Sequence, residues 1–294
     1  MSTPRVWFIT GCSTGIGRAL TEVALAKGDA VVATARKPAT LDALAAAHPP
    51  SRLLVLALDV TAEDAVTAAF AAAKARFGRV DVVVNNAGWA NVGEVEGLPE
   101  AQCRALFETN FWGTVRVTKA ALAFFRDENP AGAGGRLLQM SSYLGLVGFA
   151  GSSFYSASKH AIEGFTESLA GELDPAWNIK VTLIKPGWVM TEVRNNAVTM
   201  MAPQHPAYTN PALTVNIIRA LEGNLPLEWK DATRCAEVFY RVGSMDVPPL
   251  HLVVGRDAIA AARKQLADLS ASIDQFETWS EGLEIALAPA APAA

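Results

Sequence analysis

Short runs of apolar and β-branched residues alternate with longer stretches of helical periodicity along most of the chain. Short apolar runs bounded by turn signals predict buried strands. They lie at residues 6–10, 30–34, 53–58, 80–84, 137–140, 179–184 and 250–253. Helical patterns lie at residues 41–47, 63–77, 101–126, 233–242 and 257–279, with two more that end near residues 27 and 173.

This alternation indicates the fold class. It predicts an α/β fold with a doubly wound, Rossmann-type parallel sheet and helices on both faces. No internal repeat or linker divides the chain, so residues 1–285 are predicted to form a single domain. The pattern breaks at residues 192–231, after the sixth strand, in a segment rich in Pro, Asn and Met that we interpret as a substrate lid. Residues 286–294 are only Ala and Pro after Leu287 and are predicted to be a disordered tail.

Charge and composition narrow the possible partners. The chain has 294 residues, a net charge of −4 and a pI of about 5.6, so no basic surface is expected for nucleic acid or an anionic membrane. No stretch reaches the roughly 18 uninterrupted apolar residues of a membrane span, and residues 1–5 are too short for the charged head of a signal peptide. The three cysteines are far apart, without a CxxC motif, and the four histidines form no metal-ligand pattern. We therefore expect a soluble cytoplasmic protein without a metal ion.

A glycine-rich turn follows the first predicted strand and opens the first helix. Such glycines let the backbone turn tightly and approach a pyrophosphate, whose charge then lies at the helix N-terminus. Cys12 inside the turn is interpreted as a small filler residue. The turn predicts a dinucleotide site formed by Gly11, Ser13, Thr14, Gly15, Ile16 and Gly17.

The end of the second strand bears on the choice of cofactor. In NAD-binding folds an acidic residue at this place binds the ribose 2′-hydroxyl, whereas an arginine suits the 2′-phosphate of NADP. Here Arg36 lies 19 residues after Gly17 and no acidic residue ends the strand. The sequence favours NADP over NAD, with NAD the alternative.

Two further strand ends carry small or polar residues. Asp59 and Val60 close the third strand, where they can meet an adenine edge, and residues 85–88 (Asn-Asn-Ala-Gly) close the fourth. Because ligands of parallel sheets bind beyond the carboxyl ends of the strands, a cofactor is expected to cross here. Asn86, Ala87 and Gly88 are the predicted contacts.

Tyr155 and Lys159 lie four residues apart on a predicted helix, so their side chains share one face. Ser142 lies 13 residues before Tyr155, at the end of the fifth strand. A lysine charge close to the phenol is expected to lower the tyrosine pKa from about 10 towards the range of acid–base catalysis. Ser142 can donate a hydrogen bond to the same substrate oxygen. Alone, a Tyr-x-x-x-Lys pair is also common on solvated helix faces.

Together these motifs resemble the short-chain dehydrogenase/reductase family, in order and spacing, from residue 5 to about residue 254. The motifs are Thr10-Gly-x-x-x-Gly-Ile-Gly17, Asn85-Asn-Ala-Gly88, Asn110, Ser142, Tyr155-x-x-x-Lys159, Pro186-Gly187 and Thr191. The resemblance implies that Tyr155 is the general acid, that Lys159 binds the nicotinamide ribose and lowers the phenol pKa, and that Ser142 orients the substrate.

The same resemblance implies roles for other residues. Asn110 would bind a water molecule that passes protons to Lys159. Thr191 would contact the carboxamide group of the nicotinamide. Cofactor contacts are also expected from Pro186, Gly187 and Val189, besides Tyr155 and Lys159. The C-terminal part is more weakly similar to members that act on steroids, retinoids or other hydrophobic carbonyls.

The residues expected near the reacting carbon are apolar. They are Trp89, Leu144, Phe149, Trp188 and Met190. An apolar pocket with one polar cluster suits a hydrophobic ketone, aldehyde or secondary alcohol. Trp188 is bulkier than expected after Pro-Gly, which bears on the size of the pocket.

The leading hypothesis is an NADP-dependent carbonyl reductase or alcohol dehydrogenase. A non-catalytic NADP(H)-binding regulatory protein is one alternative, although proteins of that kind commonly lose the tyrosine or lysine. A sugar-nucleotide epimerase or dehydratase is another, disfavoured by the glycine spacing and the apolar pocket. The sequence leaves open the substrate, the stereochemistry, the direction and the oligomeric state, a homodimer included.

Overall fold

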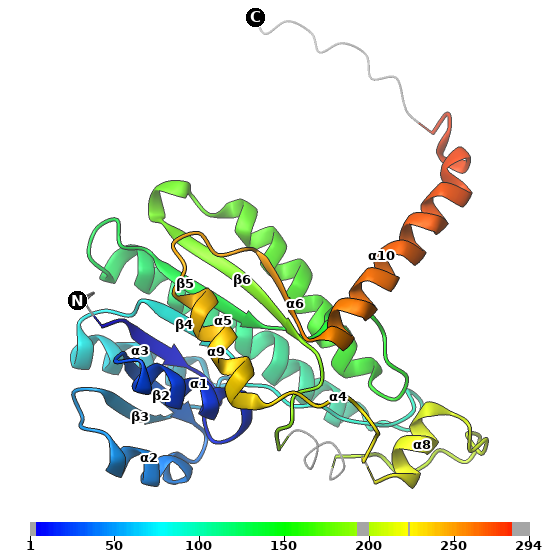
Figure 1. Ribbon diagram of the computed structural model, residues 1–294, viewed down its shortest axis with the longest axis horizontal. Helices are drawn as coiled ribbons and strands as arrows, with labels where there is room; N and C mark the ends of the chain where they lie inside the picture. Colours follow the sequence, from blue (N-terminus) through cyan, green and yellow to red (C-terminus); the bar gives the residue numbers. More distant parts are fainter. Residues whose placement is uncertain (1–3, 193–199, 223, 284–294) are drawn as a thin grey trace, which may run out of the picture.

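The computed structural model describes residues 4–192, 200–222 and 224–283. Its centre is a seven-stranded sheet with the order β3-β2-β1-β4-β5-β6-β7, in which every neighbouring pair is parallel (Figure 1). The strand order reverses between β1 and β4, which is where such sheets bind ligands. The strands are β1 Val6–Ile9, β2 Ala30–Ala35, β3 Leu53–Ala57, β4 Val82–Asn85, β5 Gly135–Met140, β6 Ile179–Pro186 and β7 His251–Val254.

Helices cover both faces of the sheet, as the alternating pattern predicts. Side chains of a strand point alternately to its two faces, so Trp7 and Ile9 pack in one apolar layer while Val6 and Phe8 pack in the other. The first layer is closed by α1, α2 and α9, and the second by α3, α5 and α6. The helices are α1 Gly15–Ala26, α2 Asp42–Ala47, α3 Glu63–Phe77, α4 Glu100–Phe107, α5 Thr114–Ala123, α6 Ser153–Glu172, α8 Thr214–Ala220, α9 Ala232–Gly243 and α10 Arg256–Phe276. The prediction of a doubly wound, Rossmann-type single domain is confirmed.

The helix predicted at residues 101–126 is not uniform. A π-helical turn at Glu108–Gly113 separates α4 from α5, and a second follows α5 at Phe124–Glu128. The first turn contains Asn110, which is fully buried. π-Turns of this kind frequently occur at functional sites because the extra residue redirects side chains and backbone groups.

The segment predicted as a lid contains a short helix that its weak periodicity did not reveal. Val215 and Ile218 of α8 are buried against Val92, which lies on the loop after β4. Residues 193–199 and 223 of the predicted lid, and the predicted tail at 286–294, lie outside the described residues. Among the described helices, none combines the length and apolar character needed to cross a bilayer.

Candidate active site

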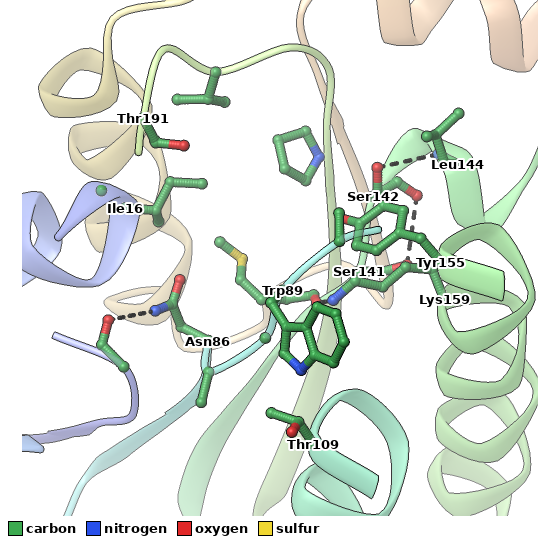
Figure 2. A pocket seen from close by; sticks show the side chains of 18 of the residues that line it. Ile16, Asn86, Trp89, Thr109, Ser141, Ser142, Leu144, Tyr155, Lys159 and Thr191 are labelled. Atoms are coloured by element: carbon green, nitrogen blue, oxygen red, sulfur yellow. Dashed lines mark hydrogen bonds between the residues drawn. The ribbon is translucent and has the colours of Figure 1, made fainter. Parts of the chain in front are cut away.

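One cavity of about 380 Å³ lies at the carboxyl ends of the central strands. All the residues predicted to form the site line this cavity except Gly17, Asn110 and Met190. Figure 2 shows side chains from separate chain segments arranged around it, among them the start of α1 (Ile16), the β4 end (Asn86, Trp89), the β5 end (Ser142) and α6 (Tyr155). The parallel sheet thus brings together residues that are far apart in the sequence.

The glycine loop has the backbone that the sequence predicts. Gly11 and Gly15 have φ values of +70° and +60°, in the left-handed region that favours glycine. Gly17 lies under the loop, where a Cβ would collide with the Gly11 carbonyl and the Asn86 amide. Gly17 therefore shapes the loop without lining the cavity.

Hydrogen bonds fix this loop to the end of β4. The Thr10 hydroxyl accepts from the backbone N–H groups of Asn86 and Ala87 at 2.9 Å each, and the Asn86 side chain donates to the Thr10 carbonyl at 2.8 Å. The N-terminus of α1 opens at this loop with no acidic residue in its first turn and no capping bond from the Thr14 side chain. Free N–H groups and the helix dipole make it suitable for a phosphate group.

Arg36 lies at the end of β2, exposed and on the cavity lining. Asp59 lies on the neighbouring strand end, where its carboxylate accepts hydrogen bonds from the Thr61 N–H and hydroxyl at 2.9 and 2.8 Å. Those bonds, and the charge of Arg36, hold the pKa of Asp59 below its usual value. Asp29, the acidic residue at the other end of β2, is held there by Trp7 and Tyr240.

Tyr155 and Lys159 share one face of α6, as predicted. The Lys159 ammonium donates a 2.7 Å hydrogen bond to the Met140 carbonyl at the end of β5, and lies 5.6 Å from the centre of the Tyr155 ring. Burial lowers the pKa of Lys159 to about 8, and the negative charge of Glu163 opposes this shift.

The expected lowering of the Tyr155 pKa is not found. Burial raises the pKa of Tyr155 to about 12, although a side-chain hydrogen bond with Ser142 opposes the shift. The physical reason is that the site withdraws the phenol from water, which penalises the phenolate, while the Lys159 ammonium is bound to a backbone carbonyl. The sequence shows that the two groups are close but not how deeply they are buried.

Ser142 lies at the junction of β5 and a 3₁₀ turn at Tyr143–Gly145. Its hydroxyl oxygen accepts from the Leu144 N–H at 3.1 Å, and the residue is almost fully buried. Because this bond uses a lone pair of the oxygen, the hydroxyl proton remains able to donate. Ser142 can therefore orient an oxygen atom next to Tyr155.

Asn110 does not line the cavity but lies directly behind it. Its side-chain oxygen accepts from the Trp89 N–H at 3.0 Å, and its amide donates to the Trp89 carbonyl at 2.9 Å and to the Ser158 hydroxyl at 3.2 Å. Ser158 in turn donates to the Tyr155 carbonyl. The side chain thus joins the β4 loop to the helix that carries Tyr155 and Lys159. Its expected role, the binding of a water that passes protons to Lys159, stays a prediction.

These arrangements accompany a clear similarity in sequence. A family model described as short chain dehydrogenase matches residues 5–202. The chain belongs to the short-chain dehydrogenase family. Family membership makes it an oxidoreductase and confirms the resemblance seen in the motifs.

Individual relatives agree with this assignment. The chain is 40% identical to an uncharacterized oxidoreductase of Schizosaccharomyces pombe over 273 residues, which cover 93% of this chain and 89% of the relative. It is 36% identical to retinol dehydrogenase 8 of Bos taurus over 270 residues, or 90% and 80% of the two chains. A solved short-chain dehydrogenase from Streptomyces avermitilis is 35% identical, with a TM-score of 0.83 over 96% of this chain and 100% of that one.

The apolar end of this short-chain dehydrogenase's cavity is aromatic. The Trp188 ring makes edge contacts with Tyr143, Phe149 and Trp229, at centroid distances of 6.0, 5.5 and 5.8 Å. Trp89, Leu144, Phe149 and Trp188 line the cavity as predicted. Met190 does not, and its side chain is 44% exposed. The reason is the backbone pairing of residues 188–190 with Lys230, which the sequence did not reveal.

Sequence reasoning missed several residues at the apolar end of the cavity. Apart from Tyr143, these come from the loop after β4 and from the predicted lid, where they share an apolar character and weak local patterning. They are Tyr143, Val92, Met201, Ile218, Leu225, Leu227 and Trp229. Tyr143 could have been found from its position next to Ser142, whereas the others depend on contacts between distant segments.

One group of possible metal ligands lies behind the cavity, among the described residues. Glu163, Glu167 and His251 each offer a ligand atom, and these atoms lie within 4.8 Å of one another. The Lys185 ammonium lies 2.6 Å from Glu163 and 2.8 Å from the His251 Nδ1 atom. The chain's own lysine therefore balances the buried carboxylate charge.

Proposed function

We propose that the chain transfers a hydride between NADP(H) and a hydrophobic ketone, aldehyde or secondary alcohol. The observation that carries this proposal is the meeting of Tyr155, Ser142 and Lys159 in a cavity that also has an aromatic, apolar end (Figure 2). One polar cluster in an apolar cavity is suited to orient a single carbonyl oxygen.

Tyr155 would serve as the general acid in reduction. A phenol with a pKa of about 12 is protonated at neutral pH, so Tyr155 holds the proton that the carbonyl oxygen needs. Ser142 would hold that oxygen by donating its hydroxyl proton. Lys159, with a pKa of about 8, is mostly protonated at neutral pH, and its charge would stabilise the phenolate left after proton transfer.

The residues present fit a nicotinamide dinucleotide. The positive-φ glycines and the uncapped N-terminus of α1 form a cradle suited to the pyrophosphate. Asn86–Gly88, Pro186–Val189 and Thr191 border the cavity beyond it. When bound, the nicotinamide supplies or accepts the hydride. Arg36 on the cavity lining, with no acidic residue ending β2, supports NADP rather than NAD.

A hydrophobic substrate is supported by the ring cluster around Trp188. The similarity to retinol dehydrogenase 8 of Bos taurus, which is named for a hydrophobic alcohol, points in the same direction. The described part of the proposed lid contributes Met201, Ile218 and Trp229 to the cavity. We propose that residues 192–231 act as the substrate cover.

The two alternatives have less support. A regulatory NADP(H) sensor would have no use for an acid and a lysine that both reach the cavity. An epimerase for sugar nucleotides would need polar partners for several hydroxyl groups, where this cavity has aromatic rings. All three cysteines are unpaired and buried, which agrees with the reducing cytoplasm that we propose as the location.

The test is a screen of bulky and small ketones, aldehydes and secondary alcohols with NADPH, NADH and their oxidised forms. Turnover is measured from the change in nicotinamide absorbance. Turnover of a hydrophobic carbonyl or alcohol that Tyr155→Phe abolishes, with cofactor binding kept, is the expected result. Tyr143→Phe is the matched control, because Tyr143 lines the same cavity and should retain activity within a few-fold. A Tyr155→Phe variant that keeps a tenth of the wild-type kcat would show that another group is the acid.

A further inference from the structure

The last helix of the described chain carries an apolar stripe that nothing in the structure covers. Only the start of α10 packs on the domain, where Ala258 is fully buried and Ala261 contacts the same cluster. Every residue from 263 to 283 is exposed. Figure 1 shows α10 leaving the body of the molecule and pointing away from the sheet.

The exposed apolar residues have the spacing of a coiled-coil seam. Leu266, Leu269, Ile273 and Phe276 follow one another at intervals of three, four and three residues, and are 68%, 54%, 57% and 41% exposed. Alternating intervals of three and four put these side chains on one face of a helix, where a second helix can pack against them. A helix with such a stripe in water is marginal on its own and is usually stabilised by packing.

The charges of α10 indicate the orientation of the partner helix. In the N-terminal half the basic Arg256, Arg263 and Lys264 outnumber the acidic Asp257, whereas Asp268 and Asp274 lie in the C-terminal half and Glu277 follows directly after the helix. The last turn of α10 has no basic residue. Acidic residues near a helix C-terminus oppose the helix dipole, so this distribution is unfavourable for an isolated helix. A second helix that runs antiparallel would place basic residues beside these acids.

We propose that α10 pairs antiparallel with α10 of a second copy of this chain, around a two-fold axis. In the register that the stripe allows, Leu266 faces the partner's Phe276 and Leu269 faces the partner's Ile273, each contact occurring twice. Arg263, on the edge of the stripe, then lies beside the partner's Glu277. A two-fold interface is self-complementary in this way, because each helix supplies both the basic and the acidic half.

A membrane surface fits the same stripe less well. Helices that lie on membranes usually carry Lys and Arg on the polar face. From residue 263 to residue 283 the chain has two basic residues, Arg263 and Lys264, against the acidic Asp268, Asp274, Glu277 and Glu281. This charge disfavours an anionic bilayer and favours a second copy.

The first test is the mass of the full-length protein in solution. Sedimentation equilibrium over a series of concentrations should give twice the 31.1 kDa of one chain. Leu269→Asp should give the monomer mass, whereas Val247→Asp, a matched control at an apolar residue that is 78% exposed outside α10, should leave the dimer intact. A wild-type monomer at every concentration, or a dimer that Leu269→Asp does not weaken, would overturn the proposal.

Charge exchange tests the antiparallel register and does not depend on core substitutions. Arg263→Glu alone and Glu277→Arg alone each place like charges together at both ends of the interface, and should raise the dimer dissociation constant roughly tenfold. The double variant restores opposite charges and should return the constant close to wild type. Lys264→Glu is the control, since it makes the same change in net charge as Arg263→Glu on the outer face of the helix.

Two results would contradict the pairing even if a dimer forms. A double variant that is as weak as the single variants would indicate a parallel or different interface. Co-sedimentation of the wild-type monomer with vesicles of phosphatidylcholine and phosphatidylserine, without a dimer in their absence, would assign the stripe to a membrane surface instead.

Discussion

The Lys185 ammonium lies 2.6 Å from a carboxylate oxygen of Glu163, and the two side chains are only 3% and 7% exposed. Glu163 lies one turn after Lys159 on α6, and its negative charge raises the pKa of Lys159 against the effect of burial. One buried carboxylate therefore serves two lysines, of which one faces the cavity. Glu163 therefore influences the charge state of Lys159 without lining the cavity.

Replacing Glu163 with Gln should destabilise the fold and change the titration of the site. Lys185 would lose its buried partner, which typically costs about 3–5 kcal/mol in the free energy of unfolding. The pKa of Lys159 should fall below its present value of about 8, because the opposing charge is gone. Urea unfolding and the pH profile of kcat measure the two effects. Glu167→Gln, at the exposed end of the same group, is the control and should change neither by much.

Lys159 gives a second prediction, on stability and pH. Its pKa is lowered from 10.5 to about 8 in the folded state, so between these values the unfolded chain binds more protons. The contribution of Lys159 to stability is therefore unfavourable below pH 8 and becomes less so as the pH rises towards 10.5. The difference in the free energy of unfolding, wild type minus Lys159→Met, should increase across this interval. A difference that stays constant from pH 7 to pH 10 would mean that burial does not shift this lysine.

The sheet could be predicted from the sequence because its strands are buried on both faces. β1 and β2 are buried at every position and almost wholly apolar, and each interval between consecutive strands holds at least one helix. The glycine loop and the Tyr155–Lys159 pair were likewise visible, because their geometry is local to one turn or one helix. Features that depend only on residues close together in the sequence are the ones that a single sequence predicts best.

What the sequence did not reveal depends on distant contacts or on burial. The raised pKa of Tyr155 follows from desolvation, which spacing alone does not describe. The exposure of Met190 follows from its pairing with Lys230, 40 residues away in the chain. The π-turn holds Asn110, whose side chain bonds to the backbone of Trp89, 21 residues away in the chain. Each of these features needs the folded structure.

Arg36 should determine the preference between the two cofactors. Arg36→Asp would place a carboxylate where the 2′-phosphate of NADP is expected, so kcat/KM should fall for NADP(H) and rise for NAD(H). We expect the ratio of the two values to change by at least about a hundredfold, near 3 kcal/mol. Lys37→Asp is the control, because Lys37 follows Arg36 directly but does not line the cavity. A change of less than a few-fold for Arg36→Asp would make it a surface residue without a role in cofactor choice.

Trp188 should set the size limit of the substrate. Its ring lies between Tyr143, Phe149 and Trp229, so Trp188→Ala would widen the apolar end of the cavity. We expect kcat/KM to rise for ketones with large ring systems and to fall for small ketones, since small substrates lose apolar contact worth about 1–3 kcal/mol. Kinetics with a size series of ketones measure this ratio. Trp112→Ala, at a tryptophan that is 50% exposed and does not line the cavity, controls for the loss of an indole ring. Equal changes for large and small ketones would indicate that Trp188 supports the packing of its neighbours, and that the segment after β6 selects substrates by other contacts.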